Sequence, residues 1–73
     1  MKNINTVNVI EENIDTGIIS GTSFLDNDEG NQEAQELFSK IALENGANDK
    51  DLEDYLDDGI FELGGYRVTI AHF

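Results

Sequence analysis

The segment IFELGGYRVTIAHF, residues 60–73, is the clearest structural element in the sequence because it reads as two strands joined by a two-residue turn. Paired glycines tolerate the positive φ angles that a tight hairpin turn requires. If Leu63 pairs with Tyr66, then Glu62 lies opposite Arg67 and forms a cross-strand pair of opposite charge. One face then collects Phe61, Leu63, Tyr66, Val68 and Ile70, and the other collects Ile60, Glu62, Arg67 and Thr69. A slip of one residue would mix the two faces, so the pattern predicts an antiparallel hairpin of strands 60–63 and 66–73.

The N-terminal part of the chain predicts a second hairpin. Two valines alternate with polar residues, which is the period of a half-buried strand over residues 4–12. Residues 13–17, NIDTG, have turn chemistry, and residues 18–25 favour a second strand antiparallel to the first. Gly21 lies inside that second strand, where a glycine indicates a bulge or a close approach of another backbone.

The middle of the chain, DNDEGNQEAQELFSKIALENGANDKDLEDYLDD over residues 26–58, predicts two helices. Asp26, Asn27 and Asp28 all suit the N-cap of the first helix, and Asp26 also has the spacing of a capping box. The core-facing positions recur at helical spacing and are Ala34, Leu37, Phe38, Ile41 and Ala42. Gly46 is the expected end of this helix, because glycine readily adopts the left-handed conformation found there.

The second helix is expected over residues 49–58, with Asn48 as its N-cap and Gly59 as its end. Its apolar face consists of Leu52, Tyr55 and Leu56. The order of elements is then β-β-α-α-β-β. The simplest architecture for this order is an α+β fold, a four-stranded antiparallel sheet with two helices on one face, in a single domain spanning residues 1–73. The order of the strands within the sheet stays open.

The negative charge is concentrated on these two helices. The net charge is −12, and residues 26–58 contribute −10 of it through twelve carboxylates and two lysines. Helical periodicity directs these side chains away from the core, so we expect a partner-binding surface. Its members are Glu29, Glu33, Glu36 and Glu44 on the first helix and Asp49, Asp51, Glu53, Asp54, Asp57 and Asp58 on the second. Lys40 lies within the first group and is expected to pair with Glu36.

A surface of this kind favours one class of partner. Neighbouring carboxylates on a helix lie about 5–6 Å apart between Cβ atoms, a spacing on the scale of duplex phosphates. A strongly negative field repels nucleic acid and anionic membranes, so we expect no direct contact with either. It attracts basic protein surfaces, including those that normally hold nucleic acid. The alternative, that the acids form only a solvated face, stays open, although such faces normally mix the two signs of charge.

Composition argues against several other kinds of site. The chain has no cysteine, so a disulfide or a thiolate metal site is not available. No apolar run is long enough to cross a membrane, and the N-terminus lacks the apolar region of a signal peptide, so we expect a cytoplasmic protein. Neither acidic cluster fits a calcium-binding loop, because Gly30 comes one place too early and the second cluster has no following glycine. We expect no metal and no other cofactor.

The sequence contains no pattern of catalytic residues. His72 is the only histidine, and strand alternation places it at the end of a strand without a positioned nucleophile or acid. Four hydroxyl side chains are candidate nucleophiles, and none has a nucleophile-elbow or base pattern around it: Ser20, Thr22, Ser23 and Ser39. We therefore expect that the protein is not an enzyme.

In size, charge and element order the chain resembles the small acidic proteins encoded by phages and mobile elements. The segments that carry the resemblance are the acidic helices of residues 26–58 and the closing DDGIFELGGYRVTIAHF of residues 57–73. That group includes anti-CRISPR and anti-restriction inhibitors, several of which act as nucleic-acid mimics. The resemblance implies a non-enzymatic inhibitor that binds a basic channel of a host defence complex in the cytoplasm of the host cell.

A second hypothesis is a small adaptor or assembly protein that binds through an apolar patch or a sheet edge. Leu43 lies opposite the apolar stripe of the first helix and is expected to be exposed. Ile10 and Ile60 fall on the less apolar side of their strands, and a four-stranded sheet has two open edges. This hypothesis predicts salt-insensitive binding or formation of a homodimer, and the oligomeric state stays open.

Overall fold

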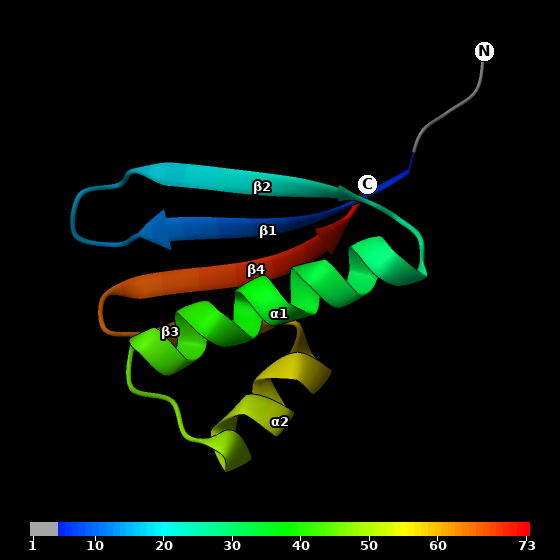
Figure 1. Ribbon diagram of the computed structural model, residues 1–73. Helices are drawn as coiled ribbons and strands as arrows, with labels where there is room; N and C mark the ends of the chain where they lie inside the picture. Colours follow the sequence, from blue (N-terminus) through cyan, green and yellow to red (C-terminus); the bar gives the residue numbers. More distant parts are fainter. Residues whose placement is uncertain (1–4) are drawn as a thin grey trace.

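The structure, a computed structural model, describes residues 5–73 and has the element order β-β-α-α-β-β (Figure 1). The elements are β1 Thr6–Asn13, β2 Ile19–Leu25, α1 Asp28–Glu44, α2 Asp49–Asp58, β3 Ile60–Leu63 and β4 Tyr66–His72. All neighbouring strands are antiparallel, and their order is β2-β1-β4-β3. The predicted α+β fold is confirmed. Position 4, where the first strand was expected to start, lies outside the described residues.

The C-terminal hairpin has the register that its sequence predicts. Leu63 pairs with Tyr66, and Glu62 pairs with Arg67. Gly64 and Gly65 have φ angles of 58° and 81°, which allow the tight two-residue turn. Strand β4 then continues past the short β3 and pairs along its length with β1, so the first and last strands form the centre of the sheet.

The N-terminal hairpin is regular, and one expectation for it is wrong. Gly21 pairs directly with Ile10 in an unbroken ladder, so β2 has no bulge there. A Cβ atom at Gly21 would meet only the Val9 carbonyl oxygen, at 3.9 Å, so no backbone approaches closely either. The position has room for a side chain, and because it is a glycine, none is present at the middle of β2.

Both helices begin at asparagine caps. The Asn27 side chain accepts a hydrogen bond of 2.7 Å from the Gly30 backbone N–H, and Asn48 accepts one of 2.8 Å from the Asp51 N–H. Asp26 is therefore not the cap of α1; its carboxylate instead accepts a hydrogen bond from the Asn31 side chain. The predicted C-terminal glycines are confirmed, with Gly46 just beyond α1 and the left-handed Gly59 capping α2.

A second glycine requirement lies where β2 turns into α1. Gly30 is buried, and a Cβ atom there would lie 1.8 Å from the Leu25 carbonyl oxygen. Real Cβ atoms never approach a backbone oxygen so closely, so only glycine fits between the first turn of α1 and the end of β2. This contact fixes the angle at which α1 leaves the strand.

The core lies between the helices and one face of the sheet. Phe61 of β3 contacts Phe38 of α1 edge to face, with ring centroids 4.9 Å apart, and stacks on Tyr55 of α2 at 5.4 Å. One side chain therefore meets both helices, which places them on the same face, as predicted. The buried apolar side chains are Val7, Val9, Ala34, Phe38, Ile41, Ala42, Phe61 and Val68.

Candidate functional site

The acids of α1 form one group, which we call the α1 row: Glu29, Glu33, Glu36 and Glu44. All four are exposed. Glu29 and Glu33 line a hollow together with Ser23–Leu25 of β2. Glu44 lines a second hollow with Glu11 of β1 and Tyr66 of β4. Glu29, Glu33 and Glu44 therefore lie on the side of α1 near the sheet, whose strands β1 and β2 are uppermost in Figure 1. Glu36 lies toward α2 instead, in a groove that Glu44 also lines.

The acids of α2 form the second group, which we call the α2 face: Asp49, Asp51, Glu53, Asp54, Asp57 and Asp58. Five of them are exposed, and Asp51 is half-buried. The apolar side chains of α2 are half-buried and packed against the core, so the acids cover the remainder of the helix surface. α2 packs against α1 and β3, so the α2 face lies at the opposite side of α1 from the strands β1 and β2.

A groove separates the two acidic groups. It has a volume of about 510 Å³ and runs between the outer side of α1 and Leu56 of α2. The α1 side of the groove presents uncharged polar residues together with two acids and one lysine: Gln32, Gln35, Ser39, Glu36, Glu44 and Lys40. Leu43 lines the groove with 47% of its surface exposed, which confirms its predicted exposure. The ten carboxylates are thus two groups on either side of a groove with an apolar floor.

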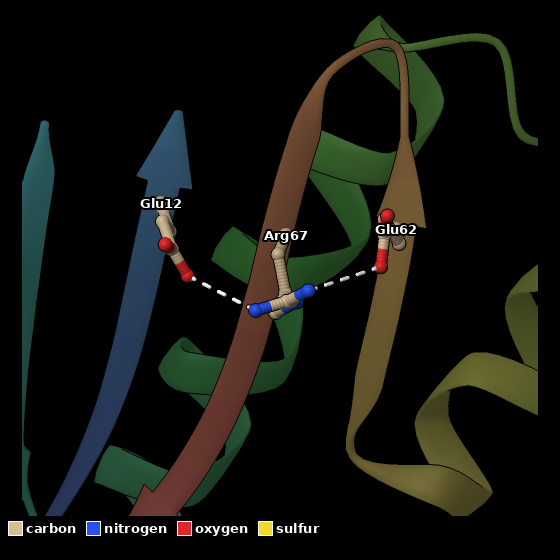
Figure 2. A network of polar contacts seen from close by, with 3 residues as sticks. All are labelled: Glu12, Glu62 and Arg67. Atoms are coloured by element: carbon tan, nitrogen blue, oxygen red, sulfur yellow. Dashed lines mark hydrogen bonds and ion pairs between the residues drawn. The ribbon is translucent and has the colours of Figure 1, made fainter. Parts of the chain in front are cut away.

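Ion pairs between residues 5–73 form only on the face of the sheet that carries no helix. Arg67 of β4 donates to Glu12 of β1 at 3.3 Å and to Glu62 of β3 at 3.5 Å, across three strands (Figure 2). The pair with Glu62 was predicted. The predicted pair between Lys40 and Glu36 is wrong, because Glu36 instead accepts a hydrogen bond of 3.3 Å from Gln32. None of the ten carboxylates is therefore neutralised by a lysine or arginine in the described part of the chain.

Glu11 belongs with the α1 row, although it was not among the predicted site residues. It lies on the helix-covered face of β1 and shares a hollow with Glu44 at the end of α1. Alternation along β1 was the signal for this position, because Glu11 has the same parity as the buried Val7 and Val9.

His72 is held by a structural contact. Its Nε2 atom lies 3.1 Å from the side-chain oxygen of Asn31, near the start of α1. The Asn31 amide in turn donates to Asp26 and to the Asn27 carbonyl. This chain of polar contacts ties the end of β4 to the entry of α1.

In residues 5–73, no group of three or more potential metal ligands lies close enough together to hold an ion. No helix in the same range has the length and apolarity needed to cross a bilayer. Comparisons with protein-family models, with curated proteins and with solved structures find no match for this chain. The charge and geometry of the two helices are the features that bear on function.

Proposed function

We propose that this protein is a non-enzymatic inhibitor that occupies a basic, nucleic-acid-binding surface of a host defence complex in the cytoplasm, as a mimic of nucleic acid. One observation carries the proposal. The α1 row and the α2 face present ten carboxylates to solvent, and none of them forms an ion pair within residues 5–73. The partner is a protein surface rich in lysine and arginine.

The lack of internal ion pairs matters for binding. A carboxylate that already has a lysine partner must give up that pair before it binds a new cation. Among residues 5–73 the acids of α1 and α2 have no such pair to break, so each contact with a basic side chain adds attraction between the two proteins. Contacts of this kind also release the counterions that the basic surface and the acidic helices held, which favours binding at low salt.

The groove between α1 and α2 suits the side chains of lysine and arginine. Lysine and arginine carry a cationic head on an apolar stem, and such side chains pack their stems on apolar surface while the head stays near water or an acid. The groove offers Leu43 and Leu56 for the stems. Glu36 and Glu44 line it for the heads and outnumber the one cation in its lining among residues 5–73, Lys40. A basic protein segment laid between the α1 row and the α2 face would therefore find acids on both sides.

The acids can also be changed without loss of the fold. The buried side chains are apolar except for that of Asn8, and none of the ten carboxylates belongs to the core. The surface can therefore be tested separately from the stability of the protein.

The test uses a charge-reversal variant and a matched control. The variant changes Asp51, Asp54 and Asp58 of the α2 face to lysine. The control changes Asp15, Asp26 and Asp28, which are exposed acids outside the candidate site, to lysine as well. It removes the hydrogen bond that Asp26 accepts from Asn31, so its folding is checked together with that of the variant. The two variants have the same net charge, so a difference between them reports the location of the charge rather than its total.

The measurement is capture of partner protein from host lysate on the immobilised chain, followed by elution with duplex DNA, single-stranded DNA or RNA, and by a salt gradient. We expect nucleic acid to displace the captured protein and the α2 variant to bind it about a hundredfold more weakly, while the control binds as the wild type does. Thermal melting followed by circular dichroism checks that both variants are folded. If the α2 variant and the control bind equally well, or if nucleic acid does not compete, the proposal is wrong.

The groove also supports a second candidate function, an adaptor or assembly protein that binds through apolar contacts. Leu43 and Leu56 are the observation in its favour, because together they line an apolar groove open to solvent. Leu43→Asp separates the two functions. It abolishes binding of an adaptor partner whose affinity does not change with salt, whereas a partner held by the acids keeps most of its affinity.

A further inference from the structure

β2 is an edge strand without the usual protection against pairing. Native edges are commonly blunted by charge, proline, a bulge or short length. The other edge, β3, has only four residues and carries Glu62. β2 has seven residues in regular register with β1, and no charged side chain occurs from Thr16 to Leu25.

The hydrogen-bond pattern shows which backbone groups of β2 point outward. At one end of the ladder the Asn13 N–H donates to the Ile18 carbonyl, and at the other the Asp26 N–H donates to the Asn5 carbonyl. Hydrogen-bonded pairs alternate along an antiparallel ladder, so the even-numbered residues of β2 bond to β1. The N–H groups that point away from β1 are those of Ile19, Gly21, Ser23 and Leu25.

We propose that β2 pairs antiparallel with β2 of a second copy of this chain, about a two-fold axis at Thr22, to form an eight-stranded sheet. In this register Gly21 lies opposite Ser23 of the second copy, and the outward N–H and C=O groups of these two residues bond to each other. Ile19 lies opposite Leu25 of the second copy. Both are exposed in the single chain, at 63% and 59%, and both point to the sheet face without helices.

The self-complementary pattern is the reason to assign this edge to a second copy. With the axis at Thr22, both large apolar side chains on that face of β2 meet an apolar side chain of the other molecule. A shift of the axis by one residue sets Ile19 against Ser23 or Leu25 against Gly21, and the match is lost. A sequence that complements itself when reversed is what a two-fold interface requires.

Charge also favours this edge. Two molecules of net charge −12 repel each other, and β2 is the strand on which they can approach without placing ionised side chains in direct contact. Glu29 and Glu33 nevertheless lie beside β2, so in the dimer they approach Glu29 and Glu33 of the second copy. Salt screens that repulsion, so the dimer forms more strongly as the salt concentration rises.

The first experiment uses single cysteines, because the chain has none of its own. Thr22→Cys places two thiols opposite each other in a non-hydrogen-bonded pair, where Cβ atoms lie about 4.5–5.5 Å apart and a disulfide can form after slight adjustment. Ser20→Cys is the matched control. It lies on the same face of the same strand, but its copy in the second molecule is four positions away, or about 13 Å.

We expect mild oxidation to cross-link Thr22→Cys at least about tenfold faster than Ser20→Cys, as judged by non-reducing gel electrophoresis. Equal rates, or faster cross-linking of Ser20→Cys, would contradict the register and overturn the proposal.

The second experiment measures the monomer–dimer equilibrium by sedimentation at low and high salt. Gly21→Pro removes an outward N–H while leaving the ladder to β1 intact, so it raises the dimer dissociation constant at least about tenfold. Gly21→Ala is its control and leaves the dimer in place, because the position has room for a Cβ atom. A wild-type chain that stays monomeric at millimolar concentration and high salt overturns the proposal, and so does a monomer that binds an extended foreign peptide on β2 instead.

Discussion

The two helices and strand β2 lie on the same small domain but have opposite surface chemistry. α1 and α2 carry ten exposed or half-buried candidate carboxylates, and none forms an ion pair within residues 5–73. β2 carries no charged side chain, and a row of its backbone N–H groups has no strand partner within the described residues. The first surface is suited to attraction over a distance, and the second to contact through hydrogen bonds and apolar side chains. A domain of this size thus has room for two surfaces of different chemistry on separate elements.

The largest effect is expected where the two regions join. Gly30→Ala places a Cβ atom 1.8 Å from the Leu25 carbonyl oxygen, so either the first turn of α1 or the end of β2 must move. We expect a loss of at least about 3 kcal/mol in the free energy of unfolding, which is a large part of the stability of so small a domain. Urea unfolding followed by circular dichroism measures it.

Gly21→Ala is the control for that experiment. It makes the same chemical change in the middle of β2, where the nearest atom is 3.9 Å from the new Cβ, so we expect a change of about 0.5 kcal/mol or less. Equal losses for the two variants would show that the junction between α1 and β2 is not as tight as the structure has it.

These two glycines show what the sequence could and could not predict about the fold. The glycines at the hairpin turn and at the helix ends were assigned correctly because their requirement is local and comes from backbone φ angles. Gly30 and Gly21 were not, because the space around a residue with ordinary φ depends on which segments pack against it. The order of the strands could not be predicted for the same reason. The pattern of each hairpin does not show which of its two strands pairs with the other hairpin.

An intermediate effect is expected at the start of the acidic α2. Asn48→Ala removes the acceptor for the Asp51 N–H, a hydrogen bond of 2.8 Å that caps the helix. We expect a loss of about 1 kcal/mol, because α2 has no fully buried residue to hold its first turn in place.

Hydrogen exchange of the α2 amides, compared with those of β1 and β4, measures this effect. Asn48→Asp is the control, because an aspartate also caps a helix and keeps the loss small. Faster exchange throughout the domain in Asn48→Ala, rather than in α2 alone, would argue against α2 as a locally held unit.

The candidate site was predicted in its members but not in its layout. Helical periodicity placed each carboxylate on the outside of its own helix, and the structure agrees for nine of ten, with Asp51 half-buried. Periodicity could not state on which flank of α1 the second helix packs. A signal was present in the uncharged Gln32, Gln35 and Ser39, which mark the flank that faces α2. Glu36 accepts from Gln32, and the ion pair predicted with Lys40 does not form. Spacing along the helix alone did not show which neighbour the carboxylate would contact.

The smallest effect is expected on the sheet face without helices. Arg67→Met removes both ion pairs, but the three side chains are 34–59% exposed, so water screens most of their attraction. We expect a loss of about 0.5 kcal/mol, measured by thermal melting in a double-mutant cycle with Glu62→Gln. A loss above about 2 kcal/mol would mean that this network, rather than the core, holds β1, β4 and β3 together.

The contrast between the two surfaces is tested most directly by one salt series. The dissociation constant for the captured basic partner and that for the homodimer are both measured on the wild-type chain from about 50 to 500 mM salt, a range over which the screening length falls severalfold. The account predicts opposite slopes. The partner dissociates more readily as salt rises, because its contacts are ionic. The homodimer becomes tighter, because its contacts are neutral and salt screens the repulsion between two chains of net charge −12, in which Glu29 and Glu33 lie nearest the interface. Slopes of the same sign, or a partner whose affinity does not change with salt, would contradict it.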